Sequence, residues 1–253
     1  MVIKENTPIQ CFKIDYKIDA EVFDDWALHI RRNYINDDDL LDDAAINGMT
    51  VEQYLKEYVI PQKNEPLGPT ARSGDMGEII ISDLLEFILE YSVPRYKMKN
   101  RSGKNNSQQG TDIIAYKFYK DDKTPNENDE LVATEVKTAL TKTDCSVLEN
   151  AIKHSAKDSY RLARTVDHCR KRLRELGNIS EMQDITRFLN KTEKNYKLTY
   201  VAAGISSCEA VSSPIELGVL GDQLEIKNEQ KIFFIHGRKL MDITHDIYER
   251  CRE

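Results

Sequence analysis

Two strand-like segments on either side of a charged connector constrain the fold of this chain more than any other feature. Residues 111–119 and 131–136 are rich in β-branched and aromatic side chains, a pattern that predicts a β-hairpin. Side chains two residues apart on a strand share a face, so Glu135 and Lys137 should point the same way. Asp112 stands at the start of the neighbouring strand. Two carboxylates and an ammonium group can therefore converge at one end of the hairpin.

These side chains suit phosphodiester chemistry. Mg²⁺ binds oxygen ligands and typically takes one or two carboxylates plus substrate phosphate, so Asp112 and Glu135 are candidate metal ligands. Lys137 could orient a nucleophilic water or neutralise developing phosphate charge. We expect Glu135 to face the surface. The solvated face of an ordinary strand also places Glu and Lys two residues apart, so the motif alone leaves a non-catalytic strand open.

Composition indicates an ordinary globular protein. The chain has 253 residues, which is enough for one large or two small domains. Of these residues 40% are hydrophobic and 31% are charged, as in ordinary globular proteins. No apolar run approaches the roughly 20 residues of a membrane helix, and no signal peptide is evident. The five cysteines include no Cys-x-x-Cys pair, which is typical of reduced thiols. We therefore expect a cytoplasmic protein without a membrane partner.

Charge is distributed unevenly. The net charge is −7, yet residues 1–93 hold 8 Lys or Arg against 19 Asp or Glu, so the remainder is net positive. Such asymmetry can mark a nucleic-acid face in one part of a chain. A proline-rich loop at 61–69 suggests a boundary between an N-terminal accessory, partner-docking region (1–69) and a core (70–253). The acidic run 37–43 lacks EF-hand spacing and fits a helix start or a partner-facing surface.

Periodicity gives an expected element order. The predicted elements are a strand at 9–18, helices at 19–34 and 50–58, a helix at 73–91, strands at 91–98, 111–119 and 131–136, a long helix at 146–176, a short helix at 180–191, strands at 196–205 and 231–236, and a helix at 239–252. Glu78 should lie on the first turn of the 73–91 helix, where the helix dipole favours a carboxylate. Gly77 should let this helix lie close against the sheet.

Two groups of basic residues are candidates for binding DNA phosphates. A loop between residues 94 and 110 carries five bases and no acid, and the long helix carries a basic stripe at four-residue spacing. The candidates are Arg95, Lys97, Lys99, Arg101 and Lys104 in the loop, and Lys153, Lys157, Arg161 and Arg164 on the helix. An ordinary polar loop and a solvated helix face are the alternatives. His154 and His168 are expected to be packing or surface residues.

An Asp followed after a strand and loop by Glu-x-Lys resembles the PD-(D/E)XK nuclease superfamily, although Thr111 stands where the superfamily has proline. Gly77-Glu78 resembles the helix glutamate that adds a metal-side ligand in many members. The resemblance implies an α/β fold with a restriction-endonuclease-like core, in which a helix, a three-stranded mixed sheet and a second helix are followed by further strands. An α+β accessory region would precede this core.

The architecture over roughly residues 10–250 is similar to that of the nuclease subunit of Hachiman-type antiphage defence systems. This likeness includes the acidic N-terminal region, Gly-Asp75-Met-Gly77-Glu78, Gly110-x-Asp112 and Glu135-Val-Lys137-Thr. It implies DNA cleavage dependent on Mg²⁺ or Mn²⁺, restrained by a helicase subunit encoded nearby. Asp112, Glu135, Lys137 and Glu78 would be the catalytic residues, and the three carboxylates the metal ligands. A catalytically weak adaptor, an RNase and a restriction-type nuclease are alternative functions.

Overall fold

The structure is a computed structural model of the chain. It describes residues 2–3, 7–99, 101–106, 108, 110–144, 146–155, 161–208 and 230–251.

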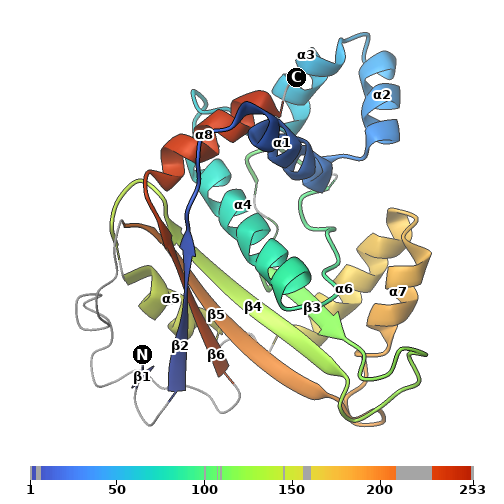
Figure 1. The fold of residues 1–253 in the computed structure, drawn as a ribbon. Coiled ribbons are helices and arrows are strands. Elements are labelled where there is room, and N and C mark those ends of the chain that lie inside the picture. Colours follow the sequence, from blue (N-terminus) through green and yellow to red (C-terminus); the bar gives the residue numbers. More distant parts are fainter. Residues whose placement is uncertain are drawn as a thin grey trace.

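A mixed β-sheet forms the centre of the molecule, with strand order β1-β2-β6-β5-β4-β3 (Figure 1). The strands are β1 (Val2–Ile3), β2 (Thr7–Ile14), β3 (Ile113–Lys117), β4 (Glu130–Ala139), β5 (Lys197–Ser207) and β6 (Gln230–Gly237). The pairs β4–β5, β5–β6 and β2–β6 are parallel, whereas β3–β4 and β1–β2 are antiparallel. The sheet is therefore larger than the expected three-stranded core, and the N-terminal segment contributes strand β2 to it.

The hairpin prediction is confirmed by the antiparallel pair β3–β4. The strand predicted at 91–98 is wrong: across these residues, all of which the structure describes, only Ser92 forms an isolated bridge, to Tyr116. Pro94 lacks the N–H that a sheet ladder needs. The apolar side chains of this segment are nevertheless used, because Val93 and Met98 are buried in the core.

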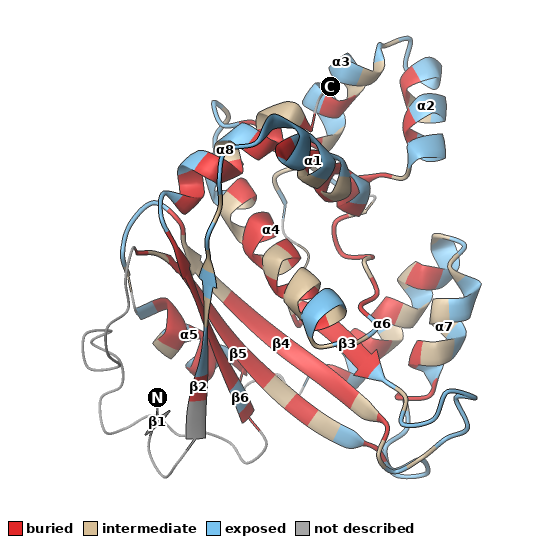
Figure 2. Cartoon of the chain, in the orientation of Figure 1, coloured by how far each residue is buried: buried red, intermediate tan, exposed pale blue. Residues whose placement is uncertain are grey.

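Helices cover both faces of the sheet. They are α1 (Ala20–Tyr34), α2 (Asp37–Ile46), α3 (Val51–Tyr54) with a π-helical turn η1 (Leu55–Val59), α4 (Gly68–Asp83) with a π-helical turn η2 (Leu84–Ile88), α5 (Ser146–Ser155), α6 (Leu162–Glu175), α7 (Ile179–Thr186) and α8 (Leu240–Arg250). Helices α4, α1 and α8 pack in one core layer, whereas α5, α6 and α7 lie on the other face (Figure 1). Buried residues are concentrated in the central strands and in the helix faces turned towards them (Figure 2).

Gly77 lets α4 lie directly against β4, as predicted. A Cβ atom on Gly77 would lie 2.2 Å from Cγ2 of Thr138, a distance that real Cβ atoms do not adopt. The predicted start of this helix is wrong, however. The helix begins at Gly68, with proline at its first turn, so Glu78 lies in the helix interior rather than on the first turn.

The predicted long basic helix is two helices, α5 and α6. Lys153 lies on α5, Arg161 immediately precedes α6, and Arg164 lies on its first turn. The prediction for Lys157 falls outside the described residues. The acidic run 37–43 forms the start of α2, which lies with α3 furthest from the sheet (Figure 1).

Candidate active site

Asp112 and Glu135 are brought together by the register of the hairpin. Ile113 pairs with Thr134, so continuing this register by one residue places Asp112 opposite Glu135. The Asp112 carboxylate is fixed there, because its Oδ2 accepts a hydrogen bond from the main-chain N–H of Val136 at 2.9 Å. Opposed residues of an antiparallel pair have Cα atoms about 4.5–5.5 Å apart. The two segments of the motif thus meet at one point of the sheet.

Glu135 and Lys137 lie on the same face of β4, as strand alternation requires, and their side chains form an ion pair. The Nζ of Lys137 also lies 3.4 Å from the main-chain oxygen of Val136. On the same side, His154 of α5 places its Nδ1 3.5 Å from Oε1 of Glu135. Glu135 is only 8% exposed, so the expectation that it faces the surface is wrong. Helix α5 covers that face of the strand.

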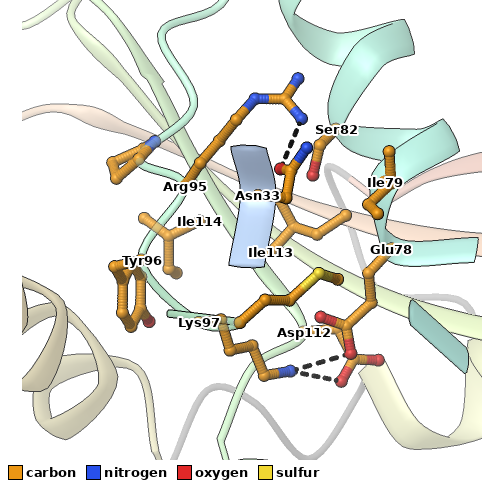
Figure 3. Close-up of a pocket in the computed structure, with 12 residues that line it drawn as sticks. Asn33, Glu78, Ile79, Ser82, Arg95, Tyr96, Lys97, Asp112, Ile113 and Ile114 are labelled. Carbon is orange, nitrogen blue, oxygen red and sulfur yellow. Dashed lines mark hydrogen bonds and ion pairs between the residues drawn. The ribbon is translucent and has the colours of Figure 1, made fainter. Parts of the chain in front are cut away.

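Glu78 reaches the site from α4, on the other side of Asp112. The Nζ of Lys97 lies 3.1 Å from Oε1 of Glu78 and 3.1 Å from Oδ1 of Asp112, and so bridges the two carboxylates (Figure 3). Desolvation by burial, reinforced by Asp112 and Asp75 and opposed by Lys97, raises the pKa of Glu78 to about 7. Burial lowers the pKa of Lys97, but its carboxylate partners outweigh this and raise the pKa above its ordinary value. Lys97 is therefore charged at neutral pH.

The site thus consists of two adjacent groups, joined by the hydrogen bond between Val136 and Asp112. One contains Glu78, Lys97 and Asp112, and the other contains Glu135, Lys137 and His154. Among the described residues, no three His, Cys, Asp or Glu side chains converge closely enough to form a metal-binding cluster. Each group instead holds a lysine ammonium against two oxygen atoms. Such hard oxygen donors, gathered around a positive charge, are chemically suited to a divalent cation.

The five basic residues of the 94–110 loop make contacts within the protein. Their partners are Asp83, Glu86 and Asn33 for Arg95; Glu78 and Asp112 for Lys97; Asn36 for Lys99; Asp75 for Arg101; and Glu65 and the Lys56 main chain for Lys104. Four of these five side chains bind carboxylates, so the positive charge seen in the sequence is largely neutralised inside the fold. The loop links the N-terminal helices to α4 and to the site.

The most deeply buried of these contacts joins Arg101 to Asp75. The two side chains form a bidentate pair, with Nη1–Oδ2 at 2.7 Å and Nη2–Oδ1 at 2.8 Å. The hydroxyl of Tyr34 donates to Oδ2 of Asp75 at 2.6 Å and lies 2.8 Å from the hydroxyl of Tyr248. This network ties α1, α4, the loop and α8 together. In the sequence, the three-residue spacing of Asp75 and Glu78 indicates that both acids lie near one face of a helix, and so that Asp75 lies close to the site.

The helical basic residues differ from those of the loop. Lys153 forms an ion pair with Glu149, whereas Arg161 and Arg164 are exposed at the start of α6.

A cleft of about 620 Å³ opens beside Lys137, between the beginning of α4, the end of β4 and the beginning of α5. Its lining combines apolar side chains with polar ones, and the polar ones include Ser73, Lys137, Thr138, Lys142, Ser146 and Asn150. Sequence reasoning missed this cleft, because it forms only when three segments distant in sequence assemble. It also missed the positions of His154 and Lys97 beside the predicted carboxylates.

Within the described part of the chain, no helix combines the length and apolar character needed to cross a lipid bilayer.

Comparison with known proteins identifies the family. A search among curated proteins gives no match. The model of the HamA family, in contrast, matches residues 2–251, almost the whole chain. The chain therefore belongs to the HamA family, a component of the Hachiman antiphage defence system that works with a partner protein.

Proposed function

We propose that this chain is the nuclease of its Hachiman system and hydrolyses phosphodiester bonds in DNA with a PD-(D/E)XK site. The observation that carries the proposal is the contact of Asp112 with the main chain of Val136, which lies between Glu135 and Lys137. This contact assembles the Asp and Glu-x-Lys parts of the motif at one position of the sheet. Family membership supplies the biological setting, because a defence system needs a component that acts on the invader.

Asp112 and Glu135 would hold a Mg²⁺ or Mn²⁺ ion, with Glu78 at its margin. When bound, such an ion supplies positive charge for the phosphate and lowers the pKa of a coordinated water. Lys137 lies between this position and the cleft, where its ammonium group can orient a water molecule and stabilise charge that develops on the phosphate. The cleft provides room for the sugar-phosphate backbone beside these side chains.

The exposed Arg161 and Arg164 extend the basic surface beyond the site and are suited to bind DNA phosphates. The fold contains no described module that projects a helix or ribbon for reading bases, which favours cleavage without a fixed target sequence. A helicase partner would restrain the nuclease until that helicase engages DNA.

The test compares the wild-type protein with Glu135→Gln and Lys137→Met on plasmid, linear duplex, single-stranded DNA and RNA, with Mg²⁺ or with EDTA. Both variants should cut DNA at least roughly a hundredfold more slowly, because each loses a charge required in the transition state. Lys137→Met should still bind Mn²⁺. The matched control is Glu130→Gln, the same change at the far end of β4, which should cleave like the wild type.

Each alternative gives a different result in this assay. Cleavage of RNA alone would identify an RNase, and fragments of fixed length would identify a restriction-type enzyme. DNA binding without cleavage under any metal condition would identify an adaptor. Cleavage by Glu135→Gln at the wild-type rate would show that the site lies elsewhere.

A further inference from the structure

Lys97 occupies a position that is unusual for a lysine. Its side chain is 9% exposed and its ammonium group points at two carboxylates from different elements, Glu78 on α4 and Asp112 beside β3 (Figure 3). Both N–O distances are 3.1 Å. Because the group is desolvated and paired, it is held in place rather than being a mobile surface charge.

We propose that Lys97 is an internal cation that holds the Glu78–Asp112 pair in the metal-free protein and must withdraw before a divalent ion binds there. This inference rests on the proposed function, since it takes these two carboxylates to be metal ligands.

Two largely buried carboxylates that share a site repel each other and are costly to desolvate, so their charged forms need a cation between them. The ammonium of Lys97 meets this need without a metal. A divalent ion cannot join it at the same oxygens, because two positive charges would then face each other at contact distance. The adjoining pocket is also small. Its free volume of about 30 Å³ holds little more than one water, whereas Mg²⁺ usually keeps several of its waters.

The segment that carries Lys97 is anchored on both sides by the N-terminal helical region. Two residues before it, Arg95 donates a hydrogen bond to Oδ1 of Asn33 at 3.0 Å. Two residues after it, Lys99 donates to Oδ1 of Asn36 at 2.5 Å. Asn33 lies at the end of α1 and Asn36 immediately before α2. The position of the Lys97 side chain is therefore coupled to these helices, and a partner that moves them changes how readily the metal enters. This coupling gives a route by which a docked protein can control the site from outside the cleft.

The first experiment measures Mn²⁺ affinity by electron paramagnetic resonance and calorimetry. Lys97→Met keeps the unbranched stem, one atom shorter, and removes the charge, so the variant should bind Mn²⁺ roughly tenfold or more tightly than the wild type, as expected when a competing positive charge is removed from a ligand set. Lys231→Met is the control, because it removes an ion pair with Glu130 elsewhere on the sheet and should leave Mn²⁺ affinity unchanged. Equal or weaker Mn²⁺ binding by Lys97→Met would overturn the proposal.

The second experiment uses the wild-type protein, so it does not depend on the folding of a variant. Amine-reactive labelling followed by mass spectrometry should find Lys97 protected in EDTA and labelled when Mn²⁺ is saturating. Lys104, which forms an ion pair with Glu65, should remain protected in both conditions. Persistent protection of Lys97 with Mn²⁺ bound overturns this inference and leaves the proposed function standing. Failure of both wild type and Lys97→Met to bind Mn²⁺ overturns the proposed metal-dependent function, and this inference with it.

Discussion

At the scale of single residues, Glu78 couples the stability of the protein to pH. Burial raises its pKa from 4.5 to about 7, so between these values the folded state binds more protons than the unfolded chain. Stability should therefore fall as the pH rises through this window, by up to about 1.4 kcal/mol per pH unit. The stabilising contribution of Glu78 is fully present below its pKa in the unfolded chain and is lost above its pKa in the folded protein.

Glu78→Gln should flatten this dependence, because the amide does not titrate. The measurement is urea denaturation in EDTA between about pH 5 and pH 7. Glu175→Gln, at an exposed ion pair at the end of α6, is the matched control and should keep the wild-type slope. The same slope in Glu78→Gln and wild type would show that another group causes the pH dependence.

The sequence predicted that Asp112, Glu135 and Lys137 lie close together because the motif spacing is local and the hairpin register is simple, whereas Glu78 was added through the family resemblance. It could not assign partners to the loop bases. Tertiary folding alone brings Lys97 to Glu78 and Arg101 to Asp75. A basic side chain has the same appearance in a sequence whether it binds phosphate or a buried carboxylate.

At the scale of elements, the contact between α4 and β4 positions Glu78 and depends on Gly77. Gly77→Ala should destabilise the protein by about 1–3 kcal/mol, because the added methyl would lie 2.2 Å from Cγ2 of Thr138. The double variant Gly77→Ala/Thr138→Ser lacks the methyl group of Thr138 and should recover most of the lost free energy of unfolding, which urea denaturation measures.

Gly74→Ala is the matched control on the same helix. A Cβ there meets no atom within 4 Å, so the substitution should stabilise the protein by about 0.5–1 kcal/mol through helix propensity. If Gly77→Ala behaved like Gly74→Ala, the close approach of α4 to the sheet would be incorrect.

The start of α6 gives a separate prediction for DNA binding. Arg161→Gln/Arg164→Gln should weaken binding by a similar factor on unrelated DNA sequences, and should reduce the slope of log affinity against log salt by roughly one unit per lost contact. Fluorescence anisotropy over a salt series measures both. Lys13→Gln/Lys17→Gln, two exposed lysines at the β2 side, should have a smaller effect. A loss confined to one DNA sequence would instead indicate a base-reading role.

Local patterns predicted most elements, and their failures have physical causes. The hairpin has strand periodicity on both sides of a polar connector, and the structure forms it. Residues 91–98 also carry apolar side chains that are buried, but they form no strand ladder, and periodicity does not distinguish these two cases. The size of the sheet was also inaccessible to local patterns, because β2 and β6 pair across almost the whole chain.

At the scale of the whole molecule, the acidic helix α2 lies with α3 on the side furthest from the sheet (Figure 1). The charge of Asp37 is neutralised within the chain, because Asp37 forms ion pairs with Arg31 and Arg32 that connect α1 to α2. Asp38 and Asp39 are exposed and carry the negative charge available to a partner. We infer that this surface receives a basic face of the partner protein, which we propose to be a helicase.

Asp38→Lys/Asp39→Lys should therefore weaken the complex with the proposed helicase partner and slow its salt-sensitive association, while leaving Mn²⁺ affinity unchanged. Surface plasmon resonance at two salt concentrations measures the effect. Asp121→Lys/Asp122→Lys makes the same charge change in the exposed connector between β3 and β4 and serves as the control. If both double variants bound the helicase equally, docking through α2 would be ruled out.

The pairing of β2 with β6 has a consequence for biosynthesis. The ribosome makes β2 first among the long strands and β6 last, yet each is the other's neighbour in the sheet. Tyr34 of α1 likewise contacts Tyr248 of α8, next to Asp75 on the helix that carries Glu78. We expect β2 to remain unpaired until β6 has left the ribosome, since contacts of such long range form slowly. A polypeptide interrupted before β6 would leave α4 without this anchor, so an incomplete translation product should not acquire the nuclease activity that we propose for the full chain.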